Sequence, residues 1–244
     1  MAPLVIDPAL DPRQLAPVFA RMGRIHLPAV FAGDTATAIH RALNGPVPWM
    51  KCIRGGGDGG DVPMADWEAM TPDRRRDWNR LLVEHSTRDL QFQFDSWRVS
   101  DLIEAGSRAG GALAPIEAVY DFLNSEAFLG FVRGLTGEAL CAFCDAQATR
   151  YRPGDFLAQH HDELAGMNRL YAYVLNFTPT WMSDWGGTLV FLDEDGHVAE
   201  GYRPAFNALN LFKVPTPHAV TQIASFAAAN RLSITGWIRS ARDD

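Results

Sequence analysis

Apolar residues in the first half of the chain recur three and four positions apart, the period of a helix with one buried face. Two such segments follow capping residues, with Asp34 before 35–44 and Thr71 before 72–85. A third segment, 114–134, also has apolar residues on related faces. Residues 91–95 alternate between polar and apolar side chains instead. The first half therefore predicts helices joined by long connections, with one strand among them.

From Leu140 onward, short runs of aromatic and β-branched residues are separated by turn residues, as in antiparallel sheets. The predicted strands are 142–151, 156–161, 170–177, 188–192, 208–212, 219–223 and 231–238, with a hairpin turn at 193–196. Such strands after a helical half predict an α+β fold with a mainly β core, a double-stranded β-helix (jelly roll) buttressed by N-terminal helices. We expect one domain over 1–244, in which 1–139 is mainly helical support and 140–240 is the jelly-roll core.

Composition narrows the classes of partner. The chain has 244 residues, of which 47% are hydrophobic, enough for one substantial core. Its formal net charge of -7 and the lack of a long basic run argue against a protein that holds nucleic acid. The cluster Arg74–Arg76 is interpreted as the solvated face of the predicted helix 72–85. No apolar run reaches the roughly 18 residues of a membrane span, and the first ten residues lack a signal-peptide pattern, so we expect a cytoplasmic protein.

Two further motifs are given structural interpretations. Cys141 and Cys144 form a Cys-x-x-Cys pair in or beside a predicted strand, and only Cys52 remains as another thiol. Packed thiols are favoured over a redox pair or a zinc site. The glycine-rich stretch 54–61 lacks the Gly-Lys-Ser/Thr ending of a P-loop and is interpreted as a flexible loop or active-site lid.

One histidine and one carboxylate have the spacing of metal ligands in a strand. His160 and Asp162 lie two positions apart in the predicted strand 156–161 and its continuation, so they share a face. A His-x-Asp alone occurs by chance in many proteins, but His218 follows 56 residues after Asp162, on a later strand. Two histidines and one carboxylate on one face of an octahedron leave three positions open, which is the arrangement of non-haem Fe(II) oxygenases.

Arg231 follows 13 residues after His218 and adds an anion-binding group. It begins a strand in which Leu232 and Ile234 alternate with polar residues. Pairing of this strand back along the His218 strand would place the guanidinium inside the barrel. A buried arginine needs an anion, and its fork suits a carboxylate. The distal carboxylate of 2-oxoglutarate fits, and the alternative is a salt bridge to an internal Asp or Glu.

These motifs together resemble a known family. The sequence Tyr-Arg-Pro-Gly-Asp-Phe-Leu-Ala-Gln-His-His-Asp-Glu-Leu-Ala-Gly at 151–166, Trp-Gly-Gly-Thr-Leu at 185–189, Pro-His at 217–218 and Arg-Leu-Ser-Ile-Thr-Gly-Trp at 231–237 is similar to the prolyl hydroxylase branch of the 2-oxoglutarate/Fe(II) oxygenases. Within it, the chain most resembles the catalytic domain of the ribosomal-protein prolyl hydroxylases of eukaryotes and their single-domain bacterial relatives. The resemblance covers about residues 150–239.

The resemblance implies a role for each matching residue. His160, Asp162 and His218 fall on the iron-ligand positions, and Arg231 on the position that binds the side-chain carboxylate of 2-oxoglutarate. Tyr151 falls where this branch has a tyrosine whose hydroxyl assists the same carboxylate; the alternative is a core aromatic. The implied cofactors and cosubstrates are Fe(II), 2-oxoglutarate and O2, with ascorbate as a further factor.

The sequence departs from the family in two ways. His161 stands between the two ligands where the relatives usually carry Asp, and within these 244 residues we expect no counterpart of the second domain of the eukaryotic proteins. His161 and Glu163 also form a His-x-Glu, and a register shift of one would turn them inward instead. Counting from Tyr151 favours His160 and Asp162. His161 then points away from the iron, either to the substrate mouth or to water.

The expected function is that of a 2-oxoglutarate- and Fe(II)-dependent dioxygenase that hydroxylates a substrate C–H bond and releases succinate and CO2. The resemblance implies a prolyl residue of a protein partner as the substrate. The alternatives are a hydroxylase of a free amino acid or small metabolite, and a metal-binding cupin-type protein without 2-oxoglutarate. Arg231 distinguishes the 2-oxoglutarate-dependent enzyme from the cupin-type alternative, because a protein that does not bind 2-oxoglutarate has no need of a buried arginine opposite the metal. No nucleic-acid or membrane partner is expected, and the helical half is a candidate homodimer surface.

Overall fold

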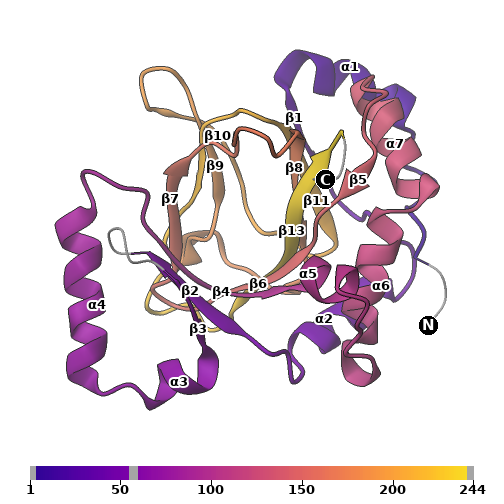
Figure 1. Ribbon diagram of the computed structural model, residues 1–244. Helices are drawn as coiled ribbons and strands as arrows, with labels where there is room; N and C mark the ends of the chain where they lie inside the picture. The colour runs from indigo at the N-terminus through magenta and orange to yellow at the C-terminus, as the bar shows by residue number, and fades with distance from the viewer. Residues whose placement is uncertain (1–3, 55–59, 241–244) are drawn as a thin grey trace.

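The β-strands of the second half are joined by strands from the first half in one antiparallel sheet. The computed structural model describes residues 4–54 and 60–240. Its strands are β1 (Arg24–Leu27), β2 (Met50–Arg54), β3 (Gly60–Pro63), β4 (Phe92–Arg98), β5 (Phe143–Cys144), β6 (Gln147–Tyr151), β7 (Phe156–His160), β8 (Arg169–Asn176), β9 (Leu189–Leu192), β10 (Val198–Tyr202), β11 (Ala208–Lys213), β12 (His218–Val220) and β13 (Arg231–Arg239). The strand order is β1-β11-β8-β13-β6-β4-β7-β12-β9-β10, and β2, β3 and β5 pair beside this path. The sheet curls into a nearly closed barrel (Figure 1).

The two ends of this strand order meet through side chains. Arg24 of β1 lies 2.5 Å from Glu200 of β10, measured between Nε and Oε2. The rings of His26 and Tyr202 lie 5.4 Å apart across the same seam. Side-chain contacts therefore close the barrel where no backbone pairing between β1 and β10 is found among the described residues.

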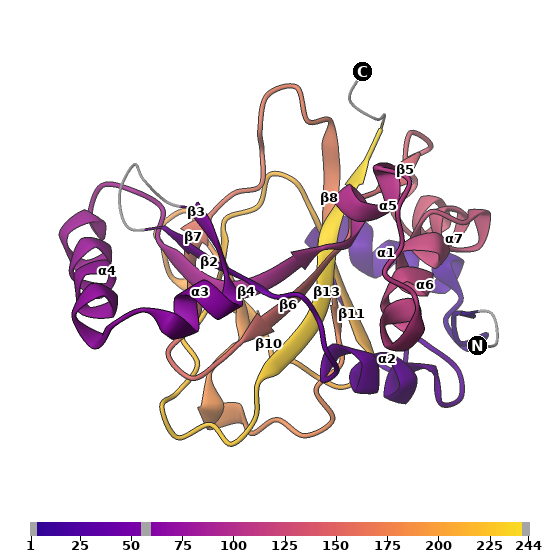
Figure 2. The same cartoon turned by 60° about the horizontal axis from the view of Figure 1, so that its bottom comes forward.

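Helices cover the barrel on two sides. They are α1 (Pro12–Met22), α2 (Thr35–Leu43), α3 (Met64–Ala69), α4 (Pro72–His85), α5 (Val99–Glu104), α6 (Ala114–Leu123) and α7 (Glu126–Thr136), with short 3-10 turns at Gly111–Leu113 and Ser183–Trp185. Helices α1, α2, α5, α6 and α7 gather on one side, while α3 and α4 lie near β2 and β3 (Figures 1 and 2).

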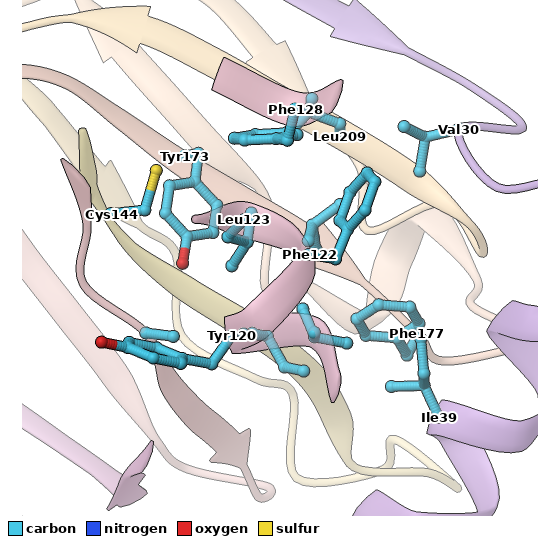
Figure 3. Close-up of a cluster of buried hydrophobic side chains, with 14 of the residues drawn as sticks. Val30, Ile39, Tyr120, Phe122, Leu123, Phe128, Cys144, Tyr173, Phe177 and Leu209 are labelled. Carbon is cyan, nitrogen blue, oxygen red and sulfur yellow. The ribbon is translucent and has the colours of Figure 1, made fainter. Parts of the chain in front are cut away.

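The hydrophobic core forms two clusters, because successive side chains of a strand point to opposite faces of the sheet. In β8, Tyr173 and Leu175 face the helices, whereas Ala172 and Val174 face the barrel interior. The helix-facing cluster joins Phe128 and other residues of α6 and α7 to the outer face of the sheet (Figure 3). The predicted jelly roll buttressed by helices is confirmed.

Several boundaries differ from the sequence-based expectation. The predicted helix 114–134 is two helices, because the Ser125 hydroxyl accepts a hydrogen bond from the Phe128 backbone N–H and begins α7. Thr71 caps α4 as predicted, whereas the Asp34 side chain makes no capping hydrogen bond. Strands β1, β2 and β3 were not expected, and neither was β10, whose Val-Ala-Glu-Gly-Tyr sequence carries little apolar alternation.

The predicted pairing of the Arg231 strand is wrong. Strand β13 pairs with β5, β6 and β8, and β12 pairs with β7 and β9. A jelly roll places consecutive strands in different parts of the sheet, so proximity in sequence did not give the neighbour. The side chain of Arg231 nevertheless points into the barrel, because alternation sets its face whichever strand lies beside it.

The cysteine pair and the turn at 193–196 have the structures that the sequence predicted. Cys141 and Cys144 are buried free thiols, as predicted, and Asp193–Gly196 forms the turn between β9 and β10. The predicted glycine-rich loop falls largely on residues 55–59, which lie outside the described residues. Within the described ranges, no helix has both the length and the hydropathy of a membrane span.

Candidate metal centre

Antiparallel pairing of two strands brings the three predicted ligands together. His160 ends β7, His218 begins β12, and the two residues are direct partners in that pair. Their ring centroids lie 4.1 Å apart. Asp162 follows β7, and each of its two carboxylate oxygens lies 3.5 Å from Nε2 of one histidine. The three ligand atoms all lie within 4.8 Å of one another, a spacing that could hold a metal ion.

Backbone groups orient both imidazoles. His160 Nδ1 lies 3.0 Å from the Ala158 carbonyl oxygen, and His218 Nδ1 lies 2.8 Å from the Thr216 carbonyl oxygen. A proton on each Nδ1 is donated to these carbonyls, which leaves the Nε2 lone pairs directed at the centre. Such hydrogen bonds are typical of metal-binding histidines.

The electrostatics favour the protonation states that metal ligands require. Burial and the neighbouring His160 lower the pKa of His218 to about 4. Burial raises the pKa of Asp162, but the adjacent His160 and His218 outweigh this effect, so the pKa of Asp162 lies below its usual value. Neutral imidazole and ionised carboxylate are the forms that bind a metal.

The alternative register is not what the structure adopts. His161 and Glu163 are both exposed, whereas Asp162 is buried. The backbone carbonyl of Asp162 also accepts a hydrogen bond of 3.0 Å from Arg169, which fixes the segment after β7. His161 therefore faces water beside the centre, one of the two positions expected for it.

Arg231 forms the other end of the candidate site. Its side chain is 1% exposed, and its guanidinium carbon lies 5.0 Å from the centre of the Tyr151 ring. Its guanidinium donates a weak hydrogen bond of 3.5 Å to Ser233 Oγ, and its Nε has no partner in the described part of the chain. No Asp or Glu among residues 4–54 and 60–240 forms an ion pair with it, so the expected alternative of an internal salt bridge is not found there.

A buried cation without a counter-ion is unfavourable, and burial lowers the pKa of Arg231. Burial also raises the pKa of Tyr151, so its phenol remains a neutral hydroxyl group at physiological pH. The two side chains form what we call the anchor pocket, Arg231 with Tyr151. Its chemistry fits an anionic group that can accept hydrogen bonds, such as a carboxylate.

The Trp-Gly-Gly sequence at 185–187 shapes this pocket. A Cβ on Gly187 would lie 3.1 Å from Arg231 Cδ and 2.6 Å from Ile223 Cδ1. A Cβ on Gly186 would lie 2.0 Å from the Gln222 carbonyl oxygen. Both glycines have positive φ angles. The absence of a side chain at Gly187 therefore lets the backbone pass close to the side chain of Arg231, and its absence at Gly186 lets the backbone pass close to the Gln222 carbonyl.

One cavity joins the two ends of the site. It is lined by Tyr151, His160, Asp162, His218 and Arg231, together with the apolar walls Leu157, Val174, Leu189, Phe212 and Val220. A second cavity shares Trp237 and Thr235 with the first and also includes Arg169, whose guanidinium lies 3.5 Å above the Trp237 ring. Arg169 and Thr235 were not identified from the sequence as residues of the site, although alternation along β13 was a signal for Thr235.

Comparisons with known proteins agree with this arrangement. Residues 146–239 match the model of the 2OG-Fe(II) oxygenase superfamily. Prolyl 3-hydroxylase OGFOD1 of Mus musculus is 34% identical over 122 residues, which is 47% of this chain and 22% of that protein. The chain thus spans about a fifth of the length of this curated relative.

Solved structures share the fold. A Pseudomonas putida prolyl-4-hydroxylase is 19% identical with a TM-score of 0.59, covering 95% of this chain and 100% of that chain. A prolyl hydroxylase from Trichoplax adhaerens, in complex with a peptide fragment of the hypoxia inducible factor oxygen degradation domain, is 14% identical with a TM-score of 0.61, covering 93% of this chain and 89% of that chain. The resemblance predicted from the sequence, to the superfamily and to its prolyl hydroxylase branch, is confirmed.

Proposed function

We propose that this chain, whose residues 146–239 match the 2OG-Fe(II) oxygenase superfamily, is a 2-oxoglutarate-dependent dioxygenase that hydroxylates a prolyl residue of a protein. The unpaired, fully buried Arg231 is the observation that carries the use of 2-oxoglutarate. A metal-binding protein without this cosubstrate would gain nothing from a buried guanidinium facing the ligand cluster. The superfamily implies Fe(II), 2-oxoglutarate and O2.

The chemistry divides between the metal and the chain. His160, Asp162 and His218 would hold Fe(II), which with 2-oxoglutarate and O2 supplies the oxidation of a C–H bond and the release of succinate and CO2. Arg231 and Tyr151 bind the distal carboxylate of 2-oxoglutarate and so fix its orientation toward the ligand cluster. The apolar walls of the cavity exclude water from the reacting groups.

The second cavity is the candidate surface for the substrate, because it adjoins the metal centre. This cavity and the cavity of the metal centre share Trp237 and Thr235 in their walls. Arg169 covers one face of Trp237 and donates a hydrogen bond to the Asp162 backbone carbonyl. A substrate that contacts Arg169 would therefore lie close to a metal ligand. The likeness to OGFOD1 supports a prolyl residue as the substrate. A free amino acid or small metabolite is the alternative, and a comparison of peptides with amino acids would distinguish them.

Several finer proposals accompany this function. Ascorbate would support turnover by keeping the iron ferrous, and the protein would act in the cytoplasm as a single domain over residues 1–244. The helical face formed by α1, α6 and α7 is a candidate homodimer surface, which light scattering would test.

The test measures succinate formed from 2-oxoglutarate by the purified chain with Fe(II) and ascorbate under air. The expected result is turnover that rises with proline-containing peptides and is lost in His160→Ala. His161→Ala is the matched control, since it removes the adjacent exposed imidazole and should retain turnover. If neither turnover nor binding of 2-oxoglutarate in the presence of Mn(II) is detected, the cupin-type alternative replaces this proposal.

A further inference from the structure

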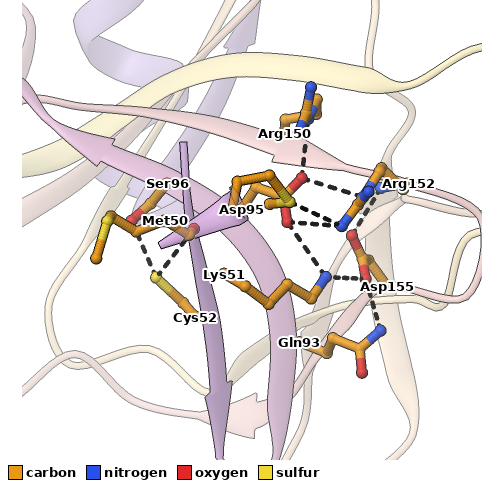
Figure 4. Close-up of polar contacts among 10 residues, drawn as sticks. Met50, Lys51, Cys52, Gln93, Asp95, Ser96, Arg150, Arg152 and Asp155 are labelled. Carbon is orange, nitrogen blue, oxygen red and sulfur yellow. Dashed lines mark hydrogen bonds and ion pairs between the residues drawn. The ribbon is translucent and has the colours of Figure 1, made fainter. Parts of the chain in front are cut away.

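A buried cluster of charges lies behind the anchor pocket, on the outer face of the sheet. It consists of Lys51 on β2, Asp95 on β4, Arg150 and Arg152 at the end of β6, and Asp155 in the turn to β7 (Figure 4). Lys51, Asp95 and Asp155 are each at most 1% exposed. Buried charges are unfavourable unless they are fully paired, so this cluster constrains the backbone that carries it.

Asp155 holds the turn between β6 and β7 through both carboxylate oxygens. Oδ1 accepts hydrogen bonds from Lys51 Nζ at 2.7 Å and from Gln93 Nε2 at 2.8 Å. Oδ2 accepts one from the Arg152 backbone N–H at 2.8 Å. Because Tyr151 immediately precedes this turn, Asp155 fixes the strand end that carries one side chain of the anchor pocket.

The backbone of the same turn holds the segment that packs against the other side chain of the pocket. The Asp155 carbonyl accepts a hydrogen bond of 3.0 Å from the Ile223 N–H, and the Gly154 N–H donates one of 2.9 Å to the Ile223 carbonyl. Ile223 is 1% exposed and packs beside Gly187, which in turn lies against Arg231. One residue thus connects to both Tyr151 and Arg231.

From these contacts we infer that Asp155 is a positioning residue for the cosubstrate: it holds the Tyr151 strand end and the Ile223 segment so that the anchor pocket matches the distal carboxylate. This inference rests on the proposed function.

Asp95 belongs to the same cluster of charges but has different contacts. Its carboxylate contacts Lys51, Arg150 and Arg152, and no hydrogen bond links it to the Ile223 segment among the described residues. Asp95 has the same charge and burial, but its carboxylate reaches the Tyr151 strand end through the Arg150 and Arg152 side chains. Asp95 therefore supplies a control for the loss of a buried carboxylate without the loss of the turn that holds the Ile223 segment.

The experiment measures binding of 2-oxoglutarate by calorimetry in the presence of Mn(II), and binding of Mn(II) alone, for the unmodified chain, Asp155→Asn and Asp95→Asn. We expect Asp155→Asn to weaken 2-oxoglutarate binding at least tenfold and to change Mn(II) affinity less than twofold. Asp95→Asn should lower the unfolding temperature while changing 2-oxoglutarate binding less than threefold. Equal weakening in both variants, or no weakening in Asp155→Asn, would overturn the inference.

Two further variants keep the test decisive if Asp155→Asn does not fold. Gln93→Leu removes one hydrogen bond to the Asp155 carboxylate and should weaken 2-oxoglutarate binding by two- to fivefold. Ile223→Ala trims the intermediate contact, and its effect on binding should be less than additive with that of Gln93→Leu, because both act along one path. Additive effects, or unchanged binding in Gln93→Leu, contradict the inference.

If the unmodified chain with Mn(II) does not bind 2-oxoglutarate, the proposed function fails and this inference fails with it.

Discussion

Arg231 is placed where its charge is useful only when a ligand is present. The buried guanidinium has no carboxylate partner in the described chain, which is unfavourable for the folded protein by itself. The sequence predicted its guanidinium inside the barrel, but on the basis of a pairing with the His218 strand that the structure does not have. Tyr151 and Ser233 become its neighbours through the pairing of β13 with β6 and through its own strand.

The first prediction at this scale concerns Arg231→Met. The substitution removes an unpaired buried charge and keeps a long side chain, so the ligand-free protein should become more stable, by about 1–4 kcal/mol. Binding of 2-oxoglutarate in the presence of Mn(II) should weaken by about 100-fold or more, since one partner of a buried charge pair is lost. Thermal unfolding with and without 2-oxoglutarate measures both effects.

Arg239→Met is the control for this prediction. Arg239 is also buried but is paired with Asp145 and the Met167 carbonyl. Its loss should lower the unfolding temperature and leave the shift by 2-oxoglutarate in place. A destabilised Arg231→Met protein that still binds 2-oxoglutarate would show that the anchor assignment is wrong.

A second prediction concerns Gly187→Ala. The new Cβ would lie 2.6 Å from Ile223 Cδ1 and 3.1 Å from Arg231 Cδ, so side chains of the anchor pocket must shift. Overpacking of this kind costs about 1–3 kcal/mol, in addition to the strain of the positive φ. Gly23→Ala has the same φ of +65° and open space around its Cβ, so it separates backbone strain from the steric effect. Only Gly187→Ala should weaken 2-oxoglutarate binding; equal effects would mean that strain alone is responsible.

At the scale of the element, sequence pattern was most informative where one face of an element is buried. Helix α6 has Ile116, Val119 and Leu123 at most 1% exposed, and its period was clear. Its separation from α7 was not predicted, because the apolar period continues through Ser125 while the hydroxyl of that residue begins a new helix. Strand β10 has no buried residue, so it offered no alternation to detect.

Helix α4 differs from the others in having no buried residue. Its charged residues pair along the helix, as Arg80 does with Asp77 and Glu84, and such exposed pairs contribute little stability. We predict that amide hydrogens of α4 exchange through local opening, much faster than those of α6, which should require global unfolding. Hydrogen exchange with mass spectrometry measures this difference. Equal protection of the two helices would contradict it and would indicate a partner surface on α4.

At the scale of the whole molecule, the candidate metal centre joins segments that are distant in sequence. The strands β7 and β12 carry His160 and His218, and Asp162 follows β7. The spacing of these residues predicted that they form one metal site, but it did not predict how the strands between them pair. A metal held by all three would therefore add a connection that the unfolded chain lacks.

The corresponding prediction is that Mn(II) raises the unfolding temperature. At a free concentration 100 times the dissociation constant, the gain is about 2.7 kcal/mol, which for a chain of this size corresponds to roughly 5–10 °C. A chelator should reverse the shift, and His218→Ala should abolish it. A shift of the same size in His218→Ala would place the metal elsewhere.

The seam between β1 and β10 bears on solubility as well as on shape. Each of these strands ends the sheet and leaves a row of backbone groups that could pair with another chain. The Arg24–Glu200 ion pair lies between the two open edges and places a charged side chain on each of them. The same contact that completes the barrel therefore protects the protein against edge-to-edge aggregation.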